Sequence, residues 1–81
     1  NMYDLRREMD KHIEFSSRGD IYYYKSFEIW INRIFNEIEI KNIITGKVSE
    51  ISYESFKTKT FDEFLAFLNF LHRDISIDSL I

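Results

Sequence analysis

The sequence predicts an α+β domain with an N-terminal helix, an antiparallel meander of three to four strands, and a long C-terminal helix packed on the sheet. Between His12 and Thr58 the chain contains no Leu, Ala, Met or Gln, but it is rich in Ile and aromatic residues. These side chains are restricted in a helix and suit a pleated strand, whereas the Leu-bearing ends of the chain favour helices. With 81 residues, the chain has room for one small domain covering residues 1–81.

The N-terminal helix is expected over residues 2–12. Met2, Leu5 and Met9 recur at steps of three and four residues with charged residues between them, which is the pattern of a short amphipathic helix. A hairpin is expected next. The alternating residues 13–16 run into Ser-Ser-Arg-Gly-Asp, which supplies turn residues before the strand-forming Ile-Tyr-Tyr-Tyr.

The segment from Tyr22 to Ile38 fits two structures. Phe27, Ile29 and Ile31 fit one face of a strand, but the spacing of the large residues from Phe27 to Ile38 also fits one face of a helix. The absence of Leu and Ala favours the strand. A helix here would make the protein mostly helical, so a helical bundle is the main alternative fold.

The clearest strand pair follows this segment. Ile38 and Ile40 alternate with charged residues, and a Thr-Gly pair at 45–46 can turn the chain into a second strand. In that second strand, residues 48–54, apolar and polar residues are interleaved. We therefore expect an antiparallel hairpin here.

The C-terminal helix is expected to begin after Thr60 and to run to about Arg73. Thr60 and Glu63 have the spacing of a capping box, in which the Thr hydroxyl accepts from the Glu63 amide and the Glu side chain reaches back. The helix is apolar over most of its circumference, more than the sector of a little over about 100° that a sheet face requires. Residues 75–81 are expected to form a loosely tied tail.

Composition limits the classes of function. The chain has no Cys, which removes disulfides and thiolate chemistry and points to a reducing compartment, so a cytoplasmic location is expected. No apolar run of about 18 residues is present, and we expect no membrane association. The net charge of -3 comes from 14 acidic and 11 basic residues, whereas a nucleic-acid binder usually carries a basic excess.

Aromatic residues in the middle of the chain form one candidate protein-binding site. They contribute to a total aromatic content of 17%, which is more than a core of this size can bury. If residues 21–31 form one strand, Tyr22, Tyr24 and Trp30 share the face opposite Ile29 and make an aromatic platform. The competing interpretation is that both sheet faces are covered and these rings belong to the core.

The C-terminal helix offers a second candidate surface. Its apolar circumference suits dimerisation or docking of a partner, with Phe67 and Phe70 as the expected contacts. The competing interpretation is a helix clasped by both the sheet and the N-terminal helix.

A nucleic-acid-binding regulator is the alternative function. The bases of the bound nucleic acid would stack on the tyrosines of the chain, and the phosphates would contact its lysines. These lysines are Lys41, Lys47, Lys57 and Lys59. Such a series more often forms a solvated face, and the acidic total opposes polyanion binding.

No catalytic or metal-binding pattern is present in the sequence. His12 and His72 are the only histidines, and Glu8 with His12 falls short of the three or more ligands that a metal site requires. The two glycines are isolated, so no phosphate-cradling loop is expected. We therefore expect no enzyme activity, no cofactor and no metal.

The sequence thus predicts a small cytoplasmic module for protein-protein interaction. We expect it to be an inhibitor or regulator of a larger protein partner, to act by occlusion through its apolar surfaces, and to associate as a homodimer.

Overall fold

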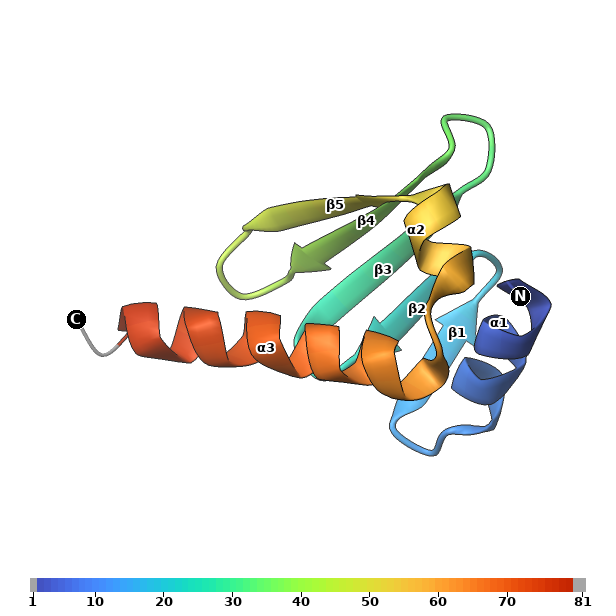
Figure 1. Cartoon of the computed structure of the whole chain (residues 1–81). Helices are drawn as coiled ribbons and strands as arrows, with labels where there is room; N and C mark the ends of the chain where they lie inside the picture. The colour runs from blue at the N-terminus through green and yellow to red at the C-terminus, as the bar shows by residue number, and fades with distance from the viewer. Residues whose placement is uncertain (1, 80–81) are drawn as a thin grey trace.

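The computed structural model describes residues 2–79 of the chain and the side chains of residues 5–73. The fold is α+β, with three helices on one face of a five-stranded antiparallel sheet whose strands follow one another in chain order (Figure 1). The helices are α1 (Met2–Lys11), α2 (Tyr53–Thr58) and α3 (Phe61–Ser79). The strands are β1 (Phe15–Arg18), β2 (Ile21–Tyr24), β3 (Phe27–Asn32), β4 (Glu37–Asn42) and β5 (Val48–Ser52).

The α+β prediction is confirmed, and the helical-bundle alternative is wrong. The segment that also fitted a helix forms β2, β3 and the start of β4, as its β-branched and aromatic residues favour. The sheet has five strands because a two-residue turn, Lys25–Ser26, divides what looked like a single strand. Lys25 has a φ of 53°, a conformation usually taken by Gly, Asn or Asp, so the sequence did not indicate a turn there.

The ends of the chain are also more helical than expected. The short helix α2 was not predicted from the sequence, although Ser52 caps it by accepting a hydrogen bond from the Ser55 amide at 3.1 Å. Helix α3 continues to Ser79, so the loose tail expected over residues 75–81 is wrong as far as residue 79. Residues 80–81 lie outside the described part of the chain.

The start of α3 follows the predicted capping box. The Glu63 amide donates to Thr60 Oγ1 at 3.1 Å, and the Thr60 amide donates to Glu63 Oε1 at 3.2 Å. Both bonds satisfy amides that the first helical turn leaves without an intrahelical acceptor. The sequence therefore specified where this helix begins.

The hydrophobic core lies between the helices and one face of the sheet. From the helices, the buried side chains are Leu5, Met9, Phe56, Phe64 and Leu68. From the strands, they are Phe15, Tyr22, Tyr24, Phe27, Ile29, Ile31, Ile38 and Ile40. Full burial of one such side chain contributes roughly 1.5 to 3 kcal/mol, so this single layer supplies the main stabilisation of the fold.

Two turns of the meander rely on the same side-chain hydrogen bonds. At the end of β3, Asn32 Oδ1 accepts from the amides two and three residues later, at 3.1 and 3.0 Å. At the end of β4, Asn42 Oδ1 accepts from the equivalent amides, both at 2.9 Å. Asn42 is only 2% exposed, and its Nδ2 donates to Ser26 Oγ at 3.0 Å. Asn42 therefore ties the β4–β5 turn to the β2–β3 turn.

Asn42→Ala is expected to lower the free energy of unfolding by about 2 to 3 kcal/mol, because it removes three part-buried hydrogen bonds and empties the buried position that joins the two turns. Asn32→Ala is the matched control, since it removes the same type of turn bonds at a half-buried position where water replaces them. Its expected cost is about 1 kcal/mol. Urea denaturation followed by circular dichroism measures both, and equal losses would contradict the role assigned to Asn42.

Candidate functional site

Within residues 2–79, all helices lie on one side of the sheet and the other face carries none. Since the helices pack on the face that holds Ile29 and Ile40, the side chains that alternate with these residues point the other way. We call this surface the open face. Its members on the four strands from β2 to β5 are Ile21, Tyr23, Glu28, Trp30, Asn32, Glu37, Glu39, Lys41, Val48, Glu50 and Ser52.

Trp30 lies at the centre of the open face. It belongs to the middle strand, and its direct neighbours in register are Ile21 on β2 and Glu39 on β4. The side chain is 45% exposed, and its indole N–H donates a hydrogen bond to the Glu28 carboxylate. Tryptophan residues of this kind, rigid and amphipathic, are among the commonest energetic anchors of protein interfaces.

Negative charge predominates around Trp30. Glu28, Glu37, Glu39 and Glu50 share the open face, whereas its basic residues are Lys41 on β4 and Arg18, which lies opposite Ile21 at the end of the edge strand β1. Lys41 lies directly opposite Glu28. Glu39 and Glu50 lie directly opposite each other, and like charges in this arrangement destabilise a sheet. The open face therefore favours a positively charged counterpart.

A hollow of about 310 Å³ adjoins the open face at the end near the β3–β4 turn. Its described lining residues are Phe35, Asn36, Glu37, Glu50, Ile51 and Ser52. Phe35 comes from the turn and is 73% exposed, while Glu37 and Glu50 bring two carboxylates from the open face. The hollow thus combines an aromatic wall with acidic groups.

The aromatic platform expected from the sequence is only partly present. Trp30 is exposed, but Tyr22 and Tyr24 are buried in the core, on the opposite face of the sheet. The error follows from the turn at Lys25–Ser26. Because this turn pairs Tyr24 directly with Phe27, residues before and after it alternate out of step, and Tyr23 rather than its neighbours joins Trp30.

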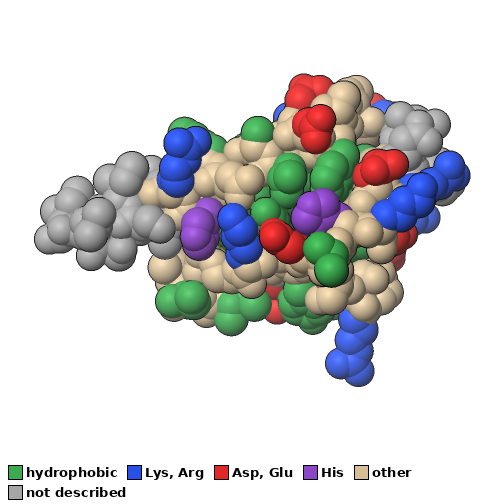
Figure 2. All heavy atoms as spheres, turned by 90° about the horizontal axis from the view of Figure 1, so that it is seen from below, with side chains coloured by type: hydrophobic (Ala, Val, Ile, Leu, Met, Phe, Trp, Pro, Cys, Tyr) green, Lys and Arg blue, Asp and Glu red, His purple; other side chains and the backbone are tan. Residues whose placement is uncertain are grey.

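The expected contacts on α3 differ in exposure. Phe67 is partly buried against the core, and the Lys59 ammonium lies 5.9 Å from its ring centroid. Phe70 is 59% exposed. Seen from below, hydrophobic side chains on this side are interspersed with charged and polar ones (Figure 2). Most of the apolar circumference of α3 is absorbed by the core, and a binding role for Phe67 and Phe70 stays a prediction.

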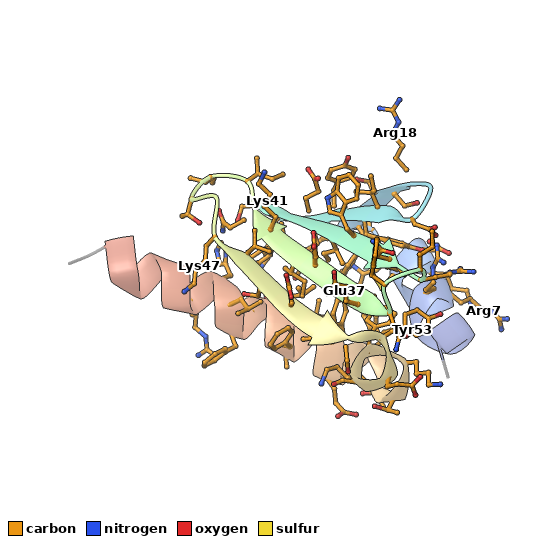
Figure 3. The ribbon with its side chains drawn as sticks, turned by 90° about the horizontal axis from the view of Figure 1, so that it is seen from above. Arg7, Arg18, Glu37, Lys41, Lys47 and Tyr53 are labelled. Atoms are coloured by element: carbon orange, nitrogen blue, oxygen red, sulfur yellow. The ribbon has the colours of Figure 1, made fainter. Side chains whose placement is uncertain are left out.

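The four candidate nucleic-acid-binding lysines do not form one patch with exposed tyrosines. Lys41 lies on β4, and Lys47 lies in the β4–β5 turn (Figure 3). Lys57 on α2 pairs with Glu54 at 2.9 Å, and Lys59 caps α2 beside the Phe67 ring. The structure therefore separates these lysines among the sheet, a turn and the helical layer.

The histidines have local packing partners. His12 Nδ1 accepts from the Glu14 amide at 3.2 Å, and its ring packs 5.5 Å from the Phe15 ring. The His72 ring lies edge-on to Phe27 at 6.2 Å. Within the described part of the chain, no group of three or more His, Cys, Asp or Glu residues is arranged to hold a metal ion. In the same part, no helix is long and apolar enough to cross a membrane.

A polar network between α1 and the sheet, at the end where the β1–β2 and β3–β4 turns lie, was not foreseen from the sequence. Arg6 Nε donates to the Tyr22 hydroxyl at 3.2 Å, and that hydroxyl donates to Asp10 Oδ1 at 2.9 Å. Arg6 also pairs with Asp20 at 3.1 Å. Burial opposes the charge of Arg6, but Tyr22 and Asp20 outweigh it and raise the pKa of Arg6. Burial also raises the pKa of Tyr22, which keeps this phenol in its donor form.

The chain was compared with protein-family models, with curated proteins and with solved structures, and no match was found.

Tyr22→Phe is expected to lower the free energy of unfolding at neutral pH by about 1 kcal/mol, through loss of the bonds to Arg6 and Asp10. Because the pKa of Tyr22 is raised in the folded protein, its stabilising contribution is present below the unfolded value of about 10. The contribution is lost as pH rises through the folded pKa. The difference between wild type and variant should therefore narrow above about pH 10. Urea denaturation over a pH series measures it, and a difference that widens there would refute the assignment.

Proposed function

We propose that the chain is a protein-interaction module that binds a partner protein through the open face of its sheet. The observation that carries the proposal is a sheet face without helices, with the half-exposed Trp30 at its centre. Sheet faces that remain uncovered usually carry polar side chains, so a central Trp beside Ile21 and Tyr23 favours a binding role. By covering a surface of its partner, the module would act as a regulator or inhibitor.

The charge of the open face supports a partner with a basic surface. Four glutamates surround the apolar centre, and the opposed pair Glu39 and Glu50 would be stabilised by a cation between them. In the adjoining hollow, a Lys or Arg side chain would lay its apolar stem against Phe35 and bring its charge to Glu37 and Glu50. We therefore commit to a partner that presents Lys or Arg side chains.

The binding energy is expected to concentrate at Trp30. Truncation of a central interface Trp commonly costs about 2 kcal/mol or more, whereas charges at the rim mainly affect the association rate and its salt dependence. The glutamates are thus expected to select the partner, and Trp30 to hold it.

Selection from a random displayed-peptide library, with the purified chain as bait, tests the proposal. We expect enriched peptides to be rich in Lys and Arg, and Trp30→Ala to weaken their binding by about 30-fold, which corresponds to about 2 kcal/mol. Phe70→Ala is the matched control, because it removes an exposed ring on the helical side. The single Trp of the chain also reports binding directly, through a shift of its fluorescence.

Charge-reversal variants distinguish the effect of the acidic open face on peptide preference from the effect of the net charge of the chain. Glu37→Lys with Glu50→Lys is expected to abolish the preference for basic peptides. Glu8→Lys with Glu14→Lys changes the net charge equally at exposed positions outside the open face and should preserve it. Peptides without basic enrichment, or peptides that bind the Trp30→Ala variant as tightly as wild type, would overturn the proposal.

Self-association is a separate question for this surface. Two open faces in contact would bring the glutamates of both copies together, and this repulsion opposes a dimer at low ionic strength. If the homodimer expected from the sequence forms through this face, its fraction should rise with salt. Light scattering over a range of protein concentrations measures this. A dimer fraction that does not change with salt would place self-association on an apolar surface instead. Loss of that dimer in the Phe70→Ala variant would assign the dimer contact to α3.

A further inference from the structure

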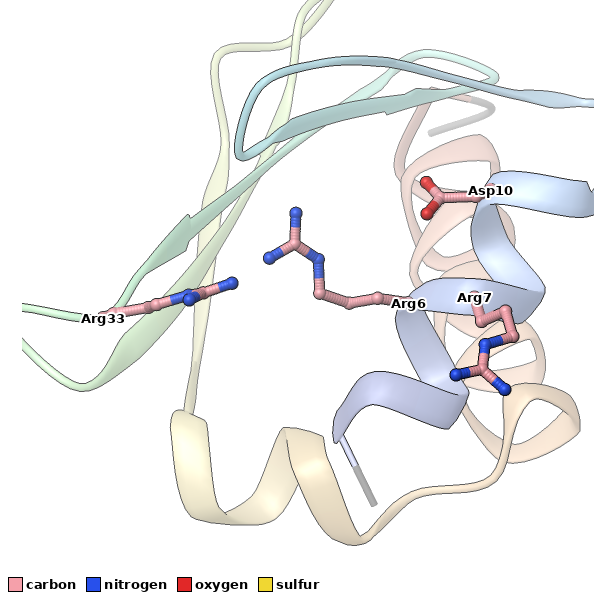
Figure 4. Close-up of a pocket in the computed structure, with 4 residues that line it drawn as sticks. All are labelled: Arg6, Arg7, Asp10 and Arg33. Carbon is pink, nitrogen blue, oxygen red and sulfur yellow. The ribbon is translucent and has the colours of Figure 1, made fainter.

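A second hollow lies between α1 and the β3–β4 turn, away from the hollow beside Phe35. Its volume is about 290 Å³, and its described lining residues are Arg6, Arg7, Asp10 and Arg33. The Arg6 and Arg33 guanidinium groups point toward one another from the helix and from the turn, as Figure 4 shows. In a chain of net charge -3, this hollow concentrates three cations.

Arg6 is held in place before any ligand arrives. Its side chain is only 17% exposed, and Tyr22 and Asp20 fix the guanidinium through Nε and Nη2. A guanidinium held in this way loses little conformational freedom when it binds an anion. Nε and Nη2 lie on one edge of the planar guanidinium group, so the remaining N–H donors of Arg6 are available to the hollow.

Two of the three cations lack a counter-ion within the described part of the chain. Arg6 is paired with Asp20, but neither Arg7 nor Arg33 forms an ion pair or hydrogen bond with a described residue. Asp10 is the only carboxylate among the described lining residues, and it accepts the Tyr22 hydroxyl. The repulsion between the facing guanidinium groups is therefore incompletely compensated.

We infer that this hollow binds a phosphate group. A phosphate monoester at neutral pH carries about -1.5 to -2 charges and three terminal oxygens. Guanidinium groups that approach from two sides can each engage different oxygens of a tetrahedral phosphate, whereas a carboxylate presents only two oxygens in one plane. The volume exceeds that of roughly nine liquid-water molecules, at about 30 Å³ each, and so also accommodates the group that carries the phosphate.

Substitutions of Asp10 and of Arg33 should change the affinity for phosphate in opposite directions. Its carboxylate opposes an anion in the hollow, so Asp10→Asn should strengthen phosphate binding while the amide oxygen still accepts the Tyr22 hydroxyl. Arg33→Ala should weaken binding by about tenfold or more, since a hydrogen bond to a charged group contributes about 1.5 to 3 kcal/mol. Both side chains are exposed on the surface, so these variants are expected to fold.

Heteronuclear NMR titration tests the site, with inorganic phosphate and N-acetyl-O-phosphoserine amide as probes and N-acetylserine amide as the uncharged control. At pH about 7.5 and constant ionic strength, we expect saturable shifts in the amides of α1 and the β3–β4 turn. Arg18→Ala is the matched control, because Arg18 is an exposed arginine that projects away from the sheet (Figure 3). It should leave the affinity nearly unchanged.

The two probes distinguish the source of the phosphate. Tighter binding of the phosphoserine derivative would assign the site to a phosphate carried on a larger molecule, and equal binding would assign it to the free ion. No saturable shift with either probe would overturn the inference. So would an equal loss in the Arg33→Ala and Arg18→Ala variants, because it would show only a response to net charge.

Discussion

The structure depends on the sealing of one sheet face by a thin layer of helices. Among the described side chains, α1 contributes Leu5 and Met9 to the buried core, and α3 contributes Phe64 and Leu68. These few side chains suffice because the strands place their Ile and aromatic residues at alternate positions that face the same way. All three helices of the described residues 2–79 lie on this face, so the second face is accessible to another molecule.

Turn geometry determines which residues reach that second face. A one-residue change in any turn would exchange the buried and exposed sets of every following strand, so the short β2–β3 turn and the asparagine-supported turns set the composition of both faces. The buried Asn42 has a particular place in this arrangement, because its bond to Ser26 joins two turns at the same end of the sheet. The position of Trp30 on the central strand follows from this register.

The fold also sorts charge that is mixed along the sequence. The glutamates of the open face come from three strands, and register brings them together around Trp30. The arginines of the second hollow come from α1 and from the β3–β4 turn. An acidic apolar face and a basic hollow thus coexist on a chain whose net charge of -3 suggests neither. The two surfaces suit ligands of opposite charge, a basic protein surface and a phosphate group.

The sequence by itself determined α1, the β4–β5 strand pair and the start of α3, because periodicity and the Thr60–Glu63 cap act locally. For the segment from Tyr22 to Ile38 it favoured strands through side-chain branching but also fitted a helix, and only strand pairing decided between them. The sequence also indicated that Trp30 would be exposed. Only the tertiary structure decided that Tyr22 and Tyr24 are buried, since the left-handed Lys25 is stabilised by strand pairing rather than by its own preference. The acidic face and the arginine hollow likewise arise from contacts between distant segments, which no local pattern records.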